Sequence, residues 1–160
     1  MLKNIPAVLS PELMMVLMKM GHGDEIVLAD GNFPADSHAR RVVRADGWGV
    51  MPLLEAILNF LPIDTFVADV AVVMQPVDPE HANPPIWSEF RKALYHAEGK
   101  EIPLTEIDRF EFYERSRHAY AIVATSETAI YGNIILKKGV VYGESQETRD
   151  KSREPEKKKG

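Results

Sequence analysis

The first residue that could take part in catalysis is a histidine between two glycines, Gly21-His22-Gly23, in the N-terminal part of the chain. The imidazole of histidine titrates close to neutral pH, so it can give or take a proton in acid–base catalysis. The flanking glycines permit unusual backbone dihedral angles and leave the ring open to solvent. The alternative is an ordinary polar loop residue beside a helix end. His22 is our candidate catalytic residue.

A carboxylate, Asp30, follows the apolar run 26–29 and precedes Gly31. The run is typical of a strand that is buried on both faces. Ligands of α/β sheets bind beyond the carboxyl ends of strands, which makes Asp30 a substrate-binding candidate, although an Asx-turn is an equally good explanation. One strand joins His22 to Asp30, so we expect them at its opposite ends. A neighbouring element or a second subunit would have to bring such groups together.

The segment Tyr131-Gly132-Asn133 opens the last apolar run of the sequence. Residues two apart on a strand point to the same side, and glycine permits close approach of a ligand or another backbone. A phenol and a carboxamide offer the donors and acceptors that a polyol needs. All three residues are substrate-binding candidates, and a β-turn is the alternative.

Arg109 lies near the start of a helix that we expect over 105–117 and begins its segment RFEFYER. In the first turn it could reach a ligand hydroxyl, and a surface ion pair is the alternative. Along the same helix we expect Glu111 to pair with Arg115 at i,i+4 spacing. Phe110 and Tyr113 are expected to pack in the core.

Several kinds of chemistry have no support in the sequence. Cysteine is absent, which excludes disulfides and thiolate chemistry. There is no P-loop, no dinucleotide-binding glycine pattern, no His-Glu-x-x-His and no Gly-x-Ser-x-Gly. His22, Asp24 and His38 lack the spacing of a metal site. We therefore expect neither metal nor cofactor, and proton transfer on a small polar molecule.

Composition indicates one globular domain. The chain has 160 residues, of which 45% are hydrophobic and 27% charged. The last 18 residues hold six basic and five acidic side chains, so residues 1–142 carry a net charge of −6 against −5 for the whole chain. We expect a folded domain over 1–142 and a disordered charged tail over 143–160.

The net negative charge of the domain argues against nucleic-acid binding. The lack of a long apolar run and of a signal-peptide pattern predicts a cytoplasmic protein without membrane contact.

The elements that must position these residues alternate between helices and apolar strands. This alternation predicts an α/β layered sheet with flanking helices, ending in a hairpin-like strand pair. The first helix is apolar on nearly every side, which indicates a central position or a subunit interface. We expect helices over 11–20, 52–60, 86–97 and 105–117, and strands over 26–29, 65–74, 119–125 and 133–136.

Three segments together resemble the family that L-fucose mutarotases share with D-ribose pyranases: MGHGDEIVLADGNFP at 20–34, RFEFYER at 109–115 and YGNIILKKGV at 131–140. The likeness runs in order from residue 1 to about 141. It implies a ring-like homo-oligomer, often a decamer, with sites near subunit boundaries. It also implies that His22 is the proton donor and Asp30 a substrate-binding acid, while Arg109 and the segment 131–133 contact the sugar.

The resemblance favours fucose over ribose, because the ribose branch typically has histidine in place of Arg109 and lacks the segment 112–115. Asn32 departs from the pattern, since some fucose enzymes have histidine there. The implied activity is isomerisation of the α- and β-anomers of L-fucose by ring opening and closure. Another monosaccharide, such as ribose, is the first alternative, and a non-catalytic monosaccharide-binding or transport-associated protein is the second. The general base is not assigned.

Overall fold

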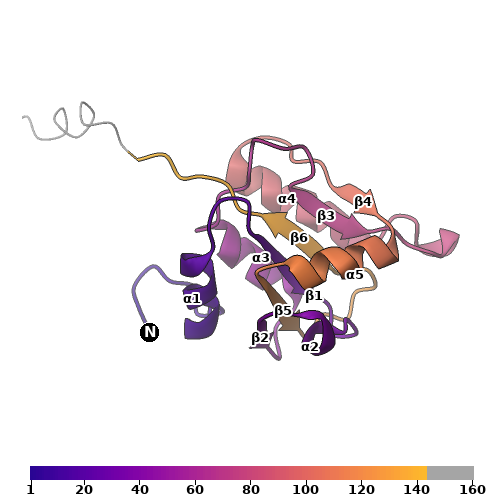
Figure 1. The fold of residues 1–160 in the computed structure, drawn as a ribbon, viewed down its shortest axis with the longest axis horizontal. Coiled ribbons are helices and arrows are strands. Elements are labelled where there is room, and N and C mark those ends of the chain that lie inside the picture. Colours follow the sequence, from indigo (N-terminus) through magenta and orange to yellow (C-terminus); the bar gives the residue numbers. More distant parts are fainter. Residues whose placement is uncertain (144–160) are drawn as a thin grey trace, which may run out of the picture.

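The chain folds around a mixed six-stranded sheet that lies between two layers of helices (Figure 1). The computed structural model describes residues 1–143. The strand order is β2-β5-β1-β6-β3-β4, and β6 is antiparallel to both of its neighbours while the other pairs are parallel. The strands are β1 (Glu25–Ala29), β2 (Val42–Ala45), β3 (Ala71–Met74), β4 (Thr105–Ile107), β5 (Ala121–Thr125) and β6 (Ile134–Lys137).

Side-chain alternation along β1 connects the sheet to both helical layers. Ile26 and Leu28 belong to the core on one face, and Val27 and Ala29 to the core on the other. All four are fully buried, as the apolar run predicts. The first face is covered by α1 (Pro11–Lys19), α3 (Val50–Leu58) and α4 (Pro85–Glu98), and the second by α2 (Ala35–His38) and α5 (Arg109–His118). In Figure 1, α5 lies in front of the sheet, with α3 and α4 behind it.

The predicted start of the first helix is confirmed. The Ser10 hydroxyl accepts a hydrogen bond from the Leu13 N–H at 3.1 Å, with Pro11 at the first helical position. The outer side of this helix is open within one chain, because Met18 is 81% exposed and Met15 49%. Of the two alternatives for this helix, a central position within the chain is therefore wrong, and a subunit interface remains a prediction.

The expected helix 105–117 is wrong at its start. Residues 105–107 form β4, which pairs with β3, and the helix begins only after Asp108. The Asp108 carboxylate accepts hydrogen bonds from the Phe110 and Glu111 N–H groups at 2.9 and 3.1 Å. An aspartate cap at the correct spacing thus outweighs the helical periodicity upstream of it.

The expected strand 65–74 is also too long. Only Ala71–Met74 forms β3, because the Asp64 carboxylate bonds the N–H groups of Thr65 and Phe66 and turns the chain there. Phe66 is 66% exposed in this bend. The β-branched composition of the segment reflects a loop followed by a short buried strand.

The final strands do not form the expected hairpin-like pair. β1 lies between β5 and β6, pairing with β5 in parallel and with β6 in antiparallel orientation. The short elements α2, β2 and β4 were not predicted, since three or four residues are too few to show a periodicity. The helix predicted over 52–60 begins earlier, at Val50.

Two further expectations concern membrane-spanning helices and the C-terminal tail. In residues 1–143 no helix combines the length and apolarity needed to cross a bilayer, and the longest, α4, has 14 residues. Residues 144–160 of the expected tail lie outside the described residues, so the boundary at 142 remains a prediction.

An ion cluster ties α5 to the start of β1. The Arg115 guanidinium donates to both Glu25 carboxylate oxygens at 2.6–3.2 Å and to Asp69 Oδ2 at 2.8 Å. Arg115 and Glu25 are largely buried, with side chains 18% and 14% exposed. The expected pairing of Arg115 with Glu111 is therefore wrong. Arg115 holds the pKa of Asp69 below its ordinary value.

We predict that Arg115→Met lowers the free energy of unfolding at neutral pH by about 2–3 kcal/mol, because it leaves the largely buried Glu25 carboxylate with Lys137, 3.5 Å away, in place of the guanidinium hydrogen bonds. Arg115 lowers the pKa of Asp69 in the folded state, so the stabilisation that this ion pair contributes is fully present above pH 3.8 and is lost as the pH falls through the lower, folded-state pKa. The share of the destabilisation by Arg115→Met that comes from Asp69 therefore disappears at low pH. Denaturant unfolding at pH 7 and pH 3 measures this. Lys92→Met, which breaks an exposed pair with Glu89, should change stability by under about 1 kcal/mol. Equal losses in both variants would contradict the prediction.

Candidate functional site

Asp30 and Asn133 meet at the carboxyl edge of the sheet, where β1 and β5 end and β6 begins. The Asn133 carboxamide bonds Asp30 twice: its oxygen accepts from the Asp30 backbone N–H at 2.7 Å, and its nitrogen donates to the carboxylate at 2.9 Å. Asn133 is 4% exposed. The antiparallel pairing of β1 and β6, in which Leu28 lies opposite Ile134, makes these residues neighbours although they are 103 positions apart in sequence.

The Asp30 carboxylate lies at the boundary between core and solvent. Burial raises its pKa above the ordinary value, although hydrogen bonds from the Asn32 N–H and Asn133 act in the opposite direction. The Asn32 bond is the Asx-turn contact that the sequence suggested. A cavity of about 280 Å³ opens beside the carboxylate. It is lined by Asp30, Gly31, Phe33, Pro34, Ala35, Asp36, Ser37, Arg44, Ala124 and Thr125.

Tyr131 adopts a left-handed backbone conformation with φ of 57°, which is uncommon for a residue other than glycine. It lies before β6, so the expected same-side alternation with Asn133 does not apply. Two contacts hold it: the indole N–H of buried Trp87 donates to its carbonyl at 3.2 Å, and its hydroxyl accepts from the Val77 N–H at 3.1 Å. Within residues 1–143 its hydroxyl hydrogen has no acceptor, so it can donate to a ligand.

Gly132 is required by close packing. A Cβ at this position would lie 2.9 Å from both the Ala129 carbonyl oxygen and Glu127 Cγ. Any side chain at this position would push the turn away from the start of β6 and displace the neighbouring Asn133.

Arg109 occupies the first position of α5 at the same edge and is exposed. Its guanidinium lies 4.8 Å from the ring centroid of Phe110, which is itself 71% exposed and not in the core as expected. Among residues 1–143 it has neither an ion pair nor a hydrogen bond. Tyr113 is partly buried and packs against Phe33, with ring centroids 5.6 Å apart.

His22 lies at the opposite edge of the sheet, where β1 begins. Its Nε2 is 3.1 Å from Asp64 Oδ1, and its ring lies 5.1 Å from Phe66 between centroids. The His22 side chain is 46% exposed and that of Asp64 only 3%. Burial acts to raise the pKa of Asp64, but hydrogen bonds from two backbone N–H groups and from His22 outweigh it and hold the pKa below its ordinary value.

This pairing defines the tautomer of the His22 ring. An ionised carboxylate only accepts hydrogen bonds, so Nε2 carries a hydrogen and Nδ1 is the nitrogen that can exchange a proton. Asp64 was not recognised in the sequence. The only available signal was an acid directly after the apolar segment 61–63, and nothing local connected it to a histidine 42 positions away.

The expected site residues thus form two groups. Asp30, Arg109, Tyr131, Gly132 and Asn133 lie at the carboxyl edge, and His22 lies at the other. The five residues of β1 separate the groups by about 16 Å. The structure confirms the expectation that His22 and Asp30 flank one strand, and within one chain it does not bring them together.

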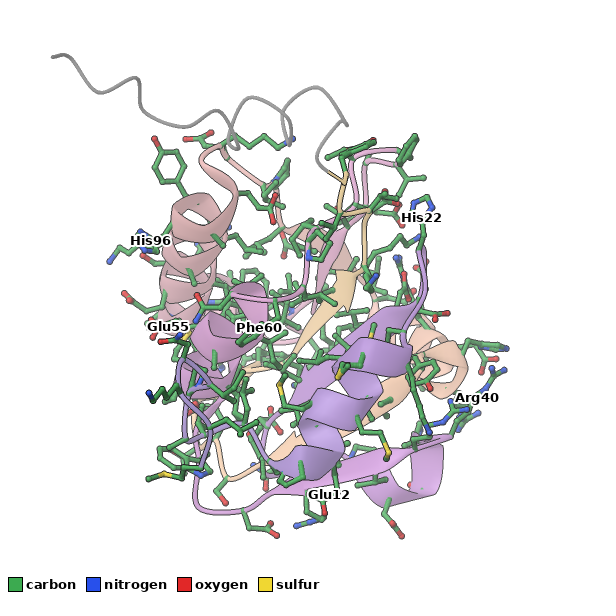
Figure 2. All side chains as sticks on the ribbon, turned by 90° about the vertical axis from the view of Figure 1, so that its left-hand side faces the viewer. Glu12, His22, Arg40, Glu55, Phe60 and His96 are labelled. Carbon is green, nitrogen blue, oxygen red and sulfur yellow. The ribbon has the colours of Figure 1, made fainter. Side chains whose placement is uncertain are left out.

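Other regions offer little for chemistry. In residues 1–143 no three acidic or histidine side chains gather closely enough to hold a metal ion. His38 contacts Phe33, Tyr113 and Arg117 instead of approaching His22. A hollow of about 700 Å³ lies over α3 and α4, and none of the expected site residues lines it. Figure 2 shows His96, which borders that hollow, on the other side of the molecule from His22.

Comparison with known proteins gives consistent matches. The chain is 53% identical to the fucose mutarotase of Homo sapiens over 146 residues, covering 88% of this chain and 94% of that protein. It is 44% identical to the L-fucose mutarotase of Histophilus somni, covering 88% and 97%. A crystal structure of the fucose mutarotase from Streptococcus pneumoniae in complex with L-fucose superposes with a TM-score of 0.83 at 47% identity, covering 88% of this chain and all of the other.

The family-level match covers nearly the whole described domain. The sequence profile of the RbsD / FucU transport protein family matches residues 3–141, which include every residue of both edges described above. On this match and these identities, the chain belongs to the RbsD / FucU family.

Proposed function

We propose that this protein is an L-fucose mutarotase, an isomerase that interconverts the α- and β-anomers of L-fucose. The observation that carries the proposal is the likeness, at 47% identity and a TM-score of 0.83, to a fucose mutarotase crystallised with L-fucose. The Asp30–Asn133 pair beside a small polar cavity is suited to a polyol, because it presents acceptors and donors at fixed positions.

The reaction needs only proton movement. A base removes the proton from the anomeric hydroxyl while an acid protonates the ring oxygen, the bond between C1 and the ring oxygen breaks, and an open-chain aldehyde forms. Rotation about the C1–C2 bond and closure on the other carbonyl face give the other anomer. Each proton taken up in opening is returned in closure, so the protein is unchanged at the end.

The residues divide this work by their chemistry. In its protonated, imidazolium form His22 donates the proton through Nδ1, while Asp64 accepts from the Nε2–H and fixes the orientation of the ring. Asp30, Asn133 and Tyr131 bind sugar hydroxyls at the carboxyl edge. Arg109 offers several fixed donors to a further hydroxyl.

A second copy of the chain completes the site in this proposal. His22 is too far from Asp30 within one chain, so His22 of one subunit must approach the carboxyl edge of another. The methionine-rich outer side of α1 supports self-association, because Met15 and Met18 expose apolar surface directly before the His22 loop. A ring-like homo-oligomer, such as a decamer, places many such contacts in one particle.

Exchange NMR on L-fucose at anomeric equilibrium tests the activity directly. Magnetisation transfer between the α and β signals should accelerate with protein concentration. Sugar binding without accelerated exchange would favour a binding or transport-associated protein, and faster exchange of D-ribose than of L-fucose would favour a ribose-type enzyme.

We predict that His22→Ala lowers the exchange rate by about 10²–10⁴-fold, because general acid catalysis is lost. Circular dichroism should show an unchanged fold, since His22 is half exposed. His96→Ala, which alters an exposed histidine on α4, is the matched control and should exchange at the wild-type rate. Wild-type exchange by His22→Ala would remove His22 from the mechanism.

We predict that Arg109→His changes the ratio of L-fucose to D-ribose exchange by about tenfold or more in favour of ribose, which corresponds to about 1.4 kcal/mol. The guanidinium reads hydroxyl positions more strictly than an imidazole does. Exchange NMR on both sugars gives the ratio, with Arg91→His on α4 as the control. An unchanged ratio would mean that Arg109 does not contact the sugar.

We predict that Met18→Glu dissociates the oligomer and lowers exchange per chain, because a buried contact would acquire a charge. Analytical ultracentrifugation measures the mass, and exchange NMR at the same concentrations measures activity. Tyr95→Glu, at a residue of α4 that is 56% exposed, controls for surface charge in general. Dissociation by the Tyr95 variant alone would place the contact on α4 instead.

A further inference from the structure

Glu127 connects its own turn to the start of α3 through its carboxylate. It lies in the turn between β5 and β6 and is partly buried. Oε1 accepts hydrogen bonds from the Thr128 and Ala129 N–H groups, each at 2.9 Å. Oε2 accepts from the Val50 N–H at 2.9 Å, which is the first residue of α3. All three partners are backbone donors, so the carboxylate acts only as an acceptor.

The start of α3 depends on this contact. Its N-cap is Gly49, which has no side chain to satisfy the free N–H groups of the first turn. Glu127 supplies the missing acceptor and a negative charge at the positive end of the helix dipole. A Cβ on Gly49 would lie 2.9 Å from Oε2, so only glycine leaves room for the carboxylate there.

The main chain of Glu127 holds the residues on either side of Asp30. Its carbonyl accepts from the Gly31 N–H at 2.9 Å. Its N–H donates to the Thr125 hydroxyl at 3.1 Å, and that hydroxyl donates to the Ala29 carbonyl at 2.8 Å. Both chain neighbours of Asp30 are therefore linked to Glu127, Gly31 directly and Ala29 through the Thr125 hydroxyl.

The side-chain stem of Glu127 packs against the other half of the Asp30–Asn133 pair. The position of a Cβ on Gly132 would be 2.9 Å from Glu127 Cγ, which leaves the backbone before Asn133 in direct contact with Glu127. One residue thus contacts the chain next to Asp30 and the chain next to Asn133.

We propose that Glu127 is a positioning residue of the sugar site: its carboxylate anchors the 126–133 turn to the start of α3, and this anchor holds Asn133 in register with Asp30. The proposal rests on the proposed function for its effect on activity. The geometry that it concerns is a property of the free protein and can be measured without sugar.

The test compares Glu127→Gln with Glu106→Gln. Glutamine keeps the shape of the side chain but presents an NH₂ group to at least one of the three N–H donors, which is repulsive. We expect Glu127→Gln to lower kcat/KM for L-fucose exchange at least about tenfold, mainly through a higher KM, at a temperature where the fold is intact. Glu106 is exposed on β4 and serves as the control, with no change expected.

Gly49→Ala displaces the Glu127 carboxylate without changing Glu127 itself. The backbone of Gly49, with φ of −75° and ψ of 170°, accommodates alanine, and the atom that must give way is the mobile carboxylate oxygen. We expect Gly49→Ala to raise the KM as Glu127→Gln does, and to have little further effect when the two are combined. This variant also carries the test if Glu127→Gln does not fold.

The NMR signals of the Asn133 side-chain amide, recorded without sugar, provide the second readout. Both variants should move these signals, whereas Glu106→Gln should not. Lower thermal stability with unmoved Asn133 signals and wild-type KM would reduce Glu127 to a helix cap and overturn the proposal. If the wild type does not exchange L-fucose, the proposed function fails, and the Asn133 signals still decide the role of Glu127.

Discussion

A carboxylate held partly out of water at the end of β1 is the constraint on which the carboxyl edge depends. Burial opposes the charge of Asp30, and the opposing contributions come from fixed N–H groups on the Asx-turn and on Asn133. These N–H groups offset the cost of burying the charge only if they stay within hydrogen-bonding distance of the carboxylate. The many hydrogen bonds of the surrounding turn hold them there. Trp87 holds the strained Tyr131, Gly132 admits a close approach, and Glu127 anchors the turn. The Asp30 carboxylate is consequently held in a fixed position, which under the proposed function prepares it for a sugar hydroxyl.

Local patterns predicted the parts of the fold whose signal lies within a few residues. The apolar run of β1 and the Ser10 cap of α1 are examples, because burial on two faces and helix capping both act locally. The same reasoning placed Asp30 correctly beyond a strand end. It failed for residues 65–70 and 105–107, where the carboxylates of Asp64 and Asp108 redirect the backbone against the surrounding periodicity.

The contacts that make up the site were beyond such reasoning. Asn133 reaches Asp30 only because β6 pairs with β1, and His22 reaches Asp64 only because the chain after α3 returns to the start of that strand. Both pairings are set by the strand order. The left-handed conformation of Tyr131 likewise has no sequence signal, since tyrosine has no preference for it. The resemblance of three segments to a known family pointed to His22, Asp30 and the segment 131–133 as candidates, but not to Asp64.

The position of β6 has a consequence for the order in which the molecule can be completed. β6 is made after every other strand, yet it lies between β1 and β3. Until it is inserted, the sheet consists of two fragments, β2-β5-β1 and β3-β4, whose inner edges present unpaired backbone groups beside mostly apolar side chains. Such edges readily pair with other chains. During synthesis on the ribosome, the nascent protein therefore carries two unpaired inner edges until β6, the last strand of residues 1–143, emerges and pairs with both.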